Sequence, residues 1–327
     1  MATAENAKLE YEAGQAAVSM TALTDSGDAT TFESAATLWS GKAGYAPVVR
    51  PNGLLTGGAV TPAAAAGNNN VDVAALTCNL AGVVTAVGAS TNVAITRPAT
   101  NVAKVCSVTV NSSGAIAVVA GTDGATATFS ETRGAAGGPP LIPVGSIEIA
   151  QVRLTTSTAA AITAAQIFAV VGVHVESANY PLYTVNADEG SVTFMGALPA
   201  IHTGSFPKGV YASYASPIFG EVSLVSDFVP PETSHSVSST QIYGTTLGST
   251  SSSLGQGSFT AYLEDGVSDS LIGQKDATLW FRFYPDRTKT PYILCQGKLG
   301  VARTFPAGDQ IRAACTISAT KAAAEVA

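Results

Sequence analysis

Apolar and polar side chains alternate along four segments in the second half of the chain. The segments are 222–228, 259–264, 279–284 and 311–318. A period of two residues places successive side chains on opposite faces of an extended strand. We therefore predict a half-buried strand in each segment, with one face toward a core.

Shorter apolar runs follow one another closely in the middle of the chain. We predict strands at 71–76, 83–87, 93–96, 105–110 and 115–120. The polar turn 111–114 between the last two runs predicts a hairpin. A second hairpin is predicted where the runs 183–185 and 192–194 flank the turn 186–190.

One helix signal interrupts this pattern. Thr163 is followed three residues later by Gln166, which is the spacing of a capping box. An apolar run over 167–171 comes next, and Gly172 is a suitable residue after a helix end. We predict a short helix over this stretch.

Segment 234–257 is dominated by Ser, Thr and Gly and shows no apolar period. We predict a long exposed loop, and loops of this length usually have a function or are disordered. Four of its apolar residues are candidate anchors on a neighbouring subunit: Ile242, Tyr243, Leu247 and Leu254.

These elements predict an all-β protein, a β-sandwich or open barrel with one or two short helices, interrupted by a smaller inserted β domain. Residues 1–53 would form short strands and long loops at the start of the main domain. Residues 54–175 would be the inserted domain, with the Gly- and Pro-rich segment 137–140 as a rigid connector. Residues 176–327 would complete the main domain.

Composition adds a hint of assembly. Only 12% of the residues are charged, whereas soluble proteins average about 25%. A low charge suits a surface that is largely covered by neighbouring subunits. The formal net charge of −7, without any cluster of Lys and Arg, argues against tight nucleic-acid binding.

No residue pattern points to catalysis, to a cofactor or to a metal. His174, His202 and His235 lie far apart without the spacing of metal ligands. The carboxylate pairs 188–189 and 264–265 each lie beside a glycine and are interpreted as solvated turns. We therefore expect a protein that is not an enzyme.

The four cysteines, Cys78, Cys106, Cys295 and Cys315, contain no CxxC pair and are predicted to be buried apolar residues. The first residues show no leader pattern, and no run of about 18 apolar residues predicts a membrane span. We expect a protein that is made and assembled in a cytoplasm.

The strand at 279–284 carries aromatic side chains on both faces. Phe281 and Phe283 supply the core face, so Trp280 and Tyr284 on the other face need a cover. That cover is either another part of the same chain or a neighbouring subunit. Both residues are therefore candidates for self-assembly.

The last third of the chain resembles the tail-tube proteins of long-tailed bacteriophages. The resemblance rests on residues 257–263, 277–285, 292–301 and 308–317, and segment 131–143 also looks like parts of phage tail proteins. It implies a β-sandwich subunit that forms hexameric rings, which stack into a virion tail tube for DNA ejection. Tape-measure and tail-terminator proteins are the other implied partners. The charge-poor segment 54–175 departs from the simplest members, and we expect it to face outward.

A tube that passes DNA should repel it, so its inner wall is expected to be acidic. Candidate lumen residues are Glu221, Asp227 and Glu264. Two other classes stay open at this point. One is another phage structural part, such as a capsid decoration, baseplate or fibre protein. The other is a carbohydrate-binding or hydrolytic β-domain protein.

Overall fold

A computed structural model describes residues 5–36, 38–65, 68–170, 183–243 and 245–327. The protein is all-β, as predicted: it has a main nine-stranded antiparallel sheet and several small antiparallel sheets, none of them closed. The described residues include no α-helix, only the two 3-10 turns η1 (Ala164–Gln166) and η2 (Ile272–Gln274).

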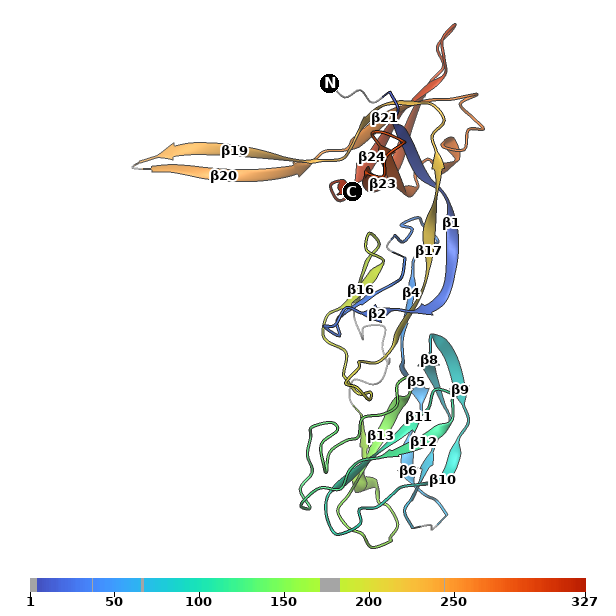
Figure 1. The fold of residues 1–327 in the computed structure, drawn as a ribbon, viewed down its shortest axis with the longest axis vertical. Helices are drawn as coiled ribbons and strands as arrows, with labels where there is room; N and C mark the ends of the chain where they lie inside the picture. The colour runs from blue at the N-terminus through green and yellow to red at the C-terminus, as the bar shows by residue number, and fades with distance from the viewer. Residues whose placement is uncertain (1–4, 37, 66–67, 171–182, 244) are drawn as a thin grey trace. The chain divides into compact units, whose positions relative to one another are not determined.

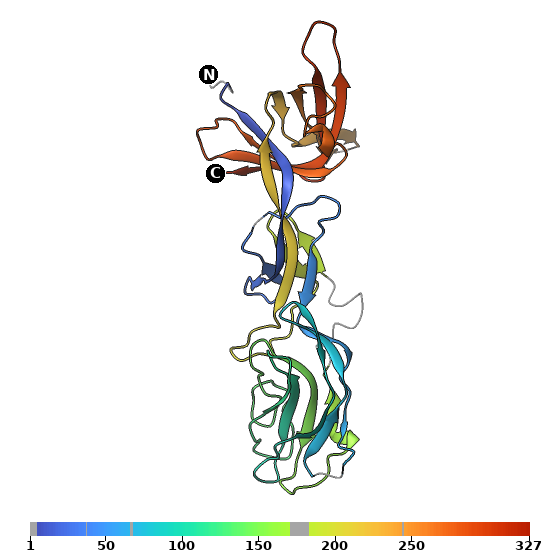
Figure 2. The ribbon, with the colours of Figure 1, turned by 90° about the vertical axis from the view of Figure 1, so that its right-hand side faces the viewer.

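The chain divides into two compact units, and neither is continuous in sequence. Unit 1 comprises Met1–Val18, Leu38–Pro47 and Tyr214–Ala327. Unit 2 comprises Ser19–Thr37 and Val48–Ser213. Strands β1 (Lys8–Ala22) and β17 (Val210–Glu221) contribute residues to both units and are neighbours in the main sheet (Figures 1 and 2).

The main sheet has the strand order β18-β21-β24-β23-β22-β1-β17-β4, and β25 pairs separately with β23. The bounds of the strands not yet introduced are β4 Val48–Pro51, β18 Val225–Val229, β21 Gly257–Tyr262, β22 Thr278–Tyr284, β23 Tyr292–Thr304, β24 Arg312–Ala319 and β25 Ala324–Val326.

One face of this sheet forms the core of unit 1. Phe259 of β21, Leu279 and Phe281 of β22 and Ile317 of β24 are buried in one cluster. Their neighbours in sequence point the other way, so the predicted alternation is confirmed in these three strands. The prediction for segment 222–228 is confirmed only in part. The strand there begins at Val225, and Leu224, which was expected on the buried face, is exposed.

Strand β1 is longer than predicted. Instead of short strands and long loops, the N-terminal region contains a strand of 15 residues. In its C-terminal half Val18, Met20 and Ala22 alternate with Ser19 and Thr21, a short period of two that the prediction missed. Pairing with β22, in which Leu9 lies opposite Phe283, holds the first part in the sheet.

Unit 2 holds four small sheets. Their strand orders are β5-β8-β9, β10-β7-β6, β12-β11-β13-β14 and β15-β16-β3-β2. The bounds are β2 Thr24–Asp25, β3 Thr31–Glu33, β5 Gly53–Gly57, β6 Val60–Pro62, β7 Asn70–Val73, β8 Leu76–Leu80, β9 Val83–Val87, β10 Ser90–Ala94, β11 Lys104–Val110, β12 Ile116–Ala120, β13 Ile147–Leu154, β14 Ile167–Ala169, β15 Tyr183–Asn186 and β16 Ser191–Phe194.

Both predicted hairpins of unit 2 are confirmed. Strand β11 pairs with β12 across the turn 111–114, and β15 pairs with β16 across the turn 187–190. The predicted strand at 71–76 is divided, because β7 ends at Val73 and β8 begins at Leu76. A separate hydrophobic cluster lies entirely between Leu54 and Val170, so this stretch has a core of its own.

The predicted helix after Thr163 is wrong over residues 163–170, and Val171 and Gly172 lie outside the described residues. The Gln166 side chain accepts a hydrogen bond from the Thr163 backbone N–H, as in a capping box, but only one 3-10 turn follows. Ile167–Ala169 then forms β14, which pairs with β13. The backbone N–H and C=O groups of this β-branched and aromatic run pair with the free edge of β13. Tertiary pairing therefore overrides the local helix signal.

Segment 137–140, predicted to be a rigid connector, lies within unit 2. All four residues are buried inside unit 2. A Cβ atom on Gly138 would lie 2.4 Å from the Thr132 carbonyl oxygen, so the backbone approach requires glycine. The Arg133 guanidinium donates to the Pro140 carbonyl at 2.7 Å, which holds the segment against the unit.

Candidate assembly surfaces

The segment predicted as a loop after residue 233 is a long β-hairpin. Strands β19 (Thr233–Ile242) and β20 (Thr245–Leu254) pair antiparallel without a register shift. They form a two-stranded sheet that no other described strand joins. Figure 1 draws this hairpin as a ribbon separate from the main sheet of unit 1.

Cross-strand hydroxyl pairs explain why a polar segment forms strands. Along one face of the hairpin, serine hydroxyls of the two strands are hydrogen-bonded at 2.7–2.9 Å: Ser234 with Ser253, Ser236 with Ser251 and Ser238 with Ser249. Such pairs stabilise a sheet modestly. Because polar side chains occupy both faces, the period of two is invisible in hydropathy, and a loop was the wrong prediction.

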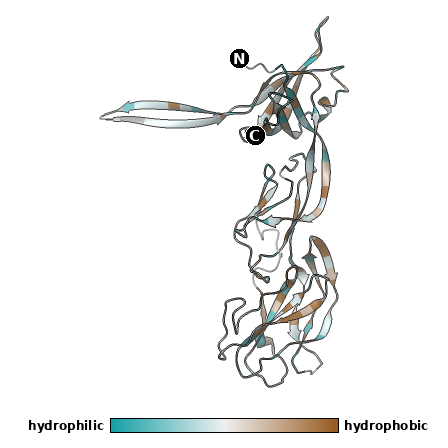
Figure 3. Ribbon diagram, viewed as in Figure 1, coloured by the Kyte–Doolittle hydropathy of each residue, from teal (hydrophilic) through white to brown (hydrophobic). Residues whose placement is uncertain are grey.

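The hairpin carries no core and no Asp, Glu, Lys or Arg over 233–254. Its described side chains are exposed apart from a half-buried Leu254, and Val237 is 76% exposed. Figure 3 shows the hairpin mostly in pale and teal colours, unlike the brown strands of unit 2. An isolated two-stranded hairpin is marginal in water, and its open edges are templates for strand pairing.

The four apolar candidates of this segment differ in position. Tyr243 lies at the tip and is fully exposed, whereas Leu254 lies at the base and is half-buried. Ile242 and Leu247 lie in β19 and β20, but their side chains fall outside the described residues.

Trp280 is covered by its own chain. Its side chain is buried, and Nε1 donates to the Trp39 carbonyl oxygen at 2.8 Å. The Trp39 ring stacks on Tyr214 at 4.7 Å between centroids. Of the two predicted covers for Trp280, the one within the chain is correct, and Trp280 presents no surface for a neighbouring subunit. Trp39 lies far away in sequence, so no pattern indicated this contact.

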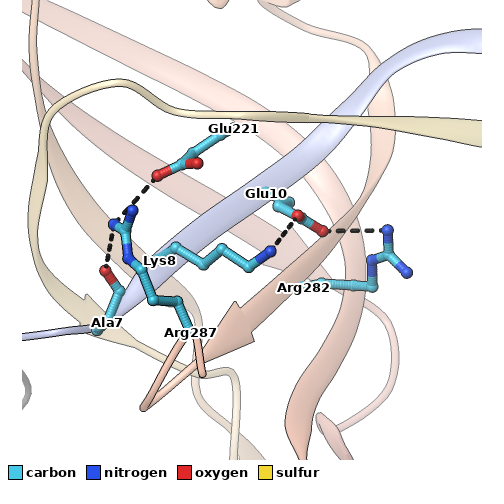
Figure 4. A network of polar contacts seen from close by, with 6 residues as sticks. All are labelled: Ala7, Lys8, Glu10, Glu221, Arg282 and Arg287. Carbon is cyan, nitrogen blue, oxygen red and sulfur yellow. Dashed lines mark hydrogen bonds and ion pairs between the residues drawn. The ribbon is translucent and has the colours of Figure 1, made fainter. Parts of the chain in front are cut away.

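Tyr284 lies half-buried on the same face of β22, within a polar network. The Lys8 ammonium is 4.4 Å from the Tyr284 ring centroid and 2.8 Å from the Glu10 carboxylate. Arg282 pairs with Glu10 at 3.0 Å (Figure 4). Its guanidinium also stacks over the ring of Phe219. The charges of Lys8, Glu10 and Arg282 are therefore paired within the chain. The face of β22 that carries Tyr284 is less open to a neighbouring subunit than the sequence suggested.

The three acidic candidates lie at different places in unit 1. Glu221 ends β17 and pairs with Arg287 at 3.2 Å, as Figure 4 shows. Asp227 is exposed at a bulge in β18, where its φ is 57°. Glu264 and Glu221 both line a cavity of 280 Å³ beside β21. The structure therefore brings two of the three carboxylates to one cavity.

The two described histidines, His202 and His235, have different surroundings. His202 is buried, its Nδ1 lies 3.0 Å from the Pro143 carbonyl oxygen, and burial lowers its pKa. His235 is exposed on the hairpin, and His174 lies outside the described residues. Within the described ranges, no group of three or more His, Cys, Asp or Glu side chains could hold a metal ion.

The cysteines and the acidic turn behave as predicted. All four cysteines are buried and free, and burial raises the pKa of Cys295 and Cys315 to about 12. The Asp265 carboxylate accepts hydrogen bonds from the backbone N–H groups of Val267 and Ser268. Hydrogen bonds from the Ser268 side chain and this backbone lower the pKa of Asp265 to about 2, as in a solvated turn.

Comparisons with known proteins do not extend these observations. No protein-family model, curated protein or solved structure matches the chain. Among the residues that the structure describes, no helix has the length and hydropathy needed to cross a membrane.

Proposed function

We propose that this chain is a structural protein that assembles with copies of itself, and that it forms the tail tube of a long-tailed bacteriophage. The observation that carries the proposal is the β19–β20 hairpin. Ten consecutive residue pairs are held together without a core, and both edges are open. A ribbon of this kind becomes stable when a neighbouring subunit covers it.

The chemistry of the hairpin favours a protein partner over nucleic acid. It carries no Lys or Arg to neutralise phosphates, and its serine-rich face offers small hydroxyls that allow close approach. Head-to-tail contacts between identical subunits close into rings when the rotation allows, and rings can stack. The resemblance of the last third to tail-tube proteins supports hexameric rings in a virion tail.

In this proposal DNA passes through the lumen without tight binding, and the partners are further copies of the chain, a tape-measure protein and a tail-terminator protein. The role is structural and not catalytic. Residues 54–170, with their separate core, would form an added module on the outside of the tube.

The test compares the natural protein with two lysine variants in unit 1. Val237→Lys places a charge on the hairpin, where the natural side chain is 76% exposed. Val267→Lys places the same charge on an exposed turn outside the hairpin, where Val267 is 71% exposed. We expect rings or hollow tubes by negative-stain electron microscopy for the natural protein and for Val267→Lys, but not for Val237→Lys.

Sedimentation at high protein concentration separates the outcomes. A strictly monomeric natural protein without filaments would refute self-assembly. A trimer, or binding to preformed capsids, would instead support a fibre or a decoration protein. Equal assembly of both lysine variants would show that the hairpin is not the contact.

A further inference from the structure

Strand β9 in unit 2 is an open sheet edge that is independent of the hairpin. It is the last strand of the sheet β5-β8-β9, and no described strand pairs with its outer side (Figure 1). Val83 and Val84 are 59% and 52% exposed. Residues 73–96 contain no Asp, Glu, Lys or Arg, so no charge protects this edge.

The turn before β9 determines which backbone groups face outward. Ala81 and Gly82 both have positive φ, 50° and 77°, which is the conformation of a two-residue hairpin loop. The residues that flank such a loop exchange hydrogen bonds, and every second pair after them does the same. Val84 and Ala86 therefore direct their N–H and C=O groups away from β8, toward the open side.

Two hydrogen bonds fix the loop that precedes β9. The Arg50 guanidinium donates to the Gly82 carbonyl oxygen at 3.0 Å, and the Asn52 amide oxygen accepts from the Ala81 N–H at 2.9 Å. Strand β8 pairs with β9 over five consecutive residue pairs without a register shift. The edge is therefore straight and preorganised for pairing.

Two other edge strands in unit 2 carry features that block strand addition. Strand β10 has a register shift with Asn92 at a φ of 55°, and β6 contains Pro62. Strand β12 is also apolar, but it lies beside β10 and most of it is half-buried. Strand β9 has no bulge, no proline and no charge.

We infer that β9 pairs antiparallel with β9 of a second copy of this chain, centred on Thr85. In this register Val84 lies opposite Ala86 of the other copy, and both residues exchange hydrogen bonds across the contact. All four outward N–H and C=O groups of each strand are then satisfied. Thr85 meets its own counterpart, and a Thr–Thr pair is a favourable cross-strand neighbour.

A second copy fits this edge, because β9 paired antiparallel with itself about Thr85 satisfies its own outward groups and opposes no like charges. Each chain carries a formal net charge of −7, so two copies repel where acidic residues meet. The uncharged stretch around β9 is a place where they can approach. This contact is an interface of unit 2 and does not rest on the proposed tube.

Cysteine cross-linking of the full-length protein tests the inference. In the proposed register the two Thr85 residues form a pair without mutual hydrogen bonds, whose Cα atoms lie about 4.5 Å apart, within the range for a disulfide. Cys78 lies directly opposite Thr85 in the β8–β9 pair, so every variant is made in a Cys78→Ala background; the other natural cysteines are buried. Under mild oxidation we expect Thr85→Cys to give disulfide-linked dimers on a non-reducing gel.

Two comparisons make the result specific. Val144→Cys, at a 61% exposed turn elsewhere in unit 2, is expected to cross-link roughly tenfold less, because only the edge register holds two cysteines at disulfide distance. Adding Val84→Lys to Thr85→Cys should lower the dimer yield by a similar factor. Equal yields from both cysteine positions, or no effect of the lysine, would overturn the inference.

A second measurement avoids the cysteine variant. Amide hydrogen exchange at Val84 and Ala86 in the natural protein should slow as protein concentration rises, and Val84→Lys should abolish that change. Fast exchange at all concentrations would also overturn the inference. A chain with the β19–β20 hairpin shortened should still cross-link through Thr85→Cys, so failure of the tube proposal and failure of this one remain distinguishable.

Discussion

Buried charges in unit 2 hold a long irregular segment onto a sheet. The Glu148 side chain is completely buried on β13 and accepts hydrogen bonds from Ser107 and from Arg133. Arg133 belongs to the segment that follows β12, and it also donates to the Pro140 carbonyl oxygen. One ion pair therefore connects a strand to a segment without regular structure.

Removing one partner of this pair should be costly. We expect Arg133→Ala to lower the free energy of unfolding of unit 2 by about 3–5 kcal/mol, because Glu148 would remain buried without its partner. The control is Glu131→Ala, which breaks the exposed pair with Arg153 and should cost at most about 1 kcal/mol. Urea denaturation measures both. Equal small losses would show that the buried pair is not important for stability.

The buried side chain of His202 predicts that the free energy of unfolding of unit 2 depends on pH. Burial lowers its pKa below the usual value of 6.5, and the nearby Arg133 charge acts in the same direction. The unfolded chain therefore binds a proton at a higher pH than the folded chain does. Stability from the neutral ring is present above about pH 6.5 and is lost as the pH falls below that value toward the lowered pKa.

Denaturant unfolding at pH 8, 6.5 and 5 measures this dependence. We expect His202→Gln to reduce the loss of stability between pH 6.5 and pH 5 relative to the natural protein. His235→Gln, at an exposed position on the hairpin, should leave the loss unchanged. If both variants follow the natural curve, titration of His202 does not contribute.

At the scale of elements, the hairpin is expected to change state on assembly. Its backbone hydrogen bonds are exposed and no core supports them, so the amides of β19 and β20 should exchange rapidly in the free subunit. A neighbouring subunit that covers the ribbon would protect them. Limited proteolysis should cut within 234–253 in the free subunit and not in the assembly. Equal cutting in both forms would contradict this prediction.

Residues 54–170 are expected to behave as a separable module. Their hydrophobic cluster includes Leu54, Val108 and Leu154 and contains no residue from outside this stretch. We predict that replacing the predicted segment 54–175 by a short Gly/Ser linker leaves a protein that still folds and assembles. Circular dichroism and electron microscopy check the two properties. Loss of folding would show that the main sheet depends on this segment.

At the scale of the whole molecule, the predicted lumen charge concerns Glu264 most directly. Glu221 already pairs with Arg287, whereas neither Asp227 nor Glu264 has an ion pair among the described residues, and of these two only Glu264 lines the cavity beside β21. If it faces the lumen, Glu264→Lys should slow DNA ejection at low salt, because each added cation strengthens phosphate binding. High salt should restore the rate.

The matched control for this charge reversal is Glu189→Lys, at a turn of unit 2 where the Asn186 amide donates to the carboxylate. It should leave ejection unchanged. Equal rates for Glu264→Lys and the natural protein, or a lumen lined mainly by Lys and Arg, would show that repulsion plays no part.

Pattern in the sequence was sufficient where each strand has one apolar face. The alternation around Phe259, Phe281 and Ile317 predicted three strands of the main sheet together with their buried faces. Polar turns flanked by β-branched runs predicted the β11–β12 and β15–β16 hairpins. In these cases the local signal and the tertiary structure agree, because burial itself produces the period of two.

Other features were decided only by the tertiary structure. In these, a residue or strand packs against a partner that is far away in sequence or that is polar. Trp280 is covered by Trp39, and β14 is a strand because β13 offers it an edge. The hairpin at 233–254 depends on hydroxyl pairs that hydropathy does not register. A sequence records which residues can be buried, but it does not record what lies against them. That choice depends on contacts between segments far apart in the chain.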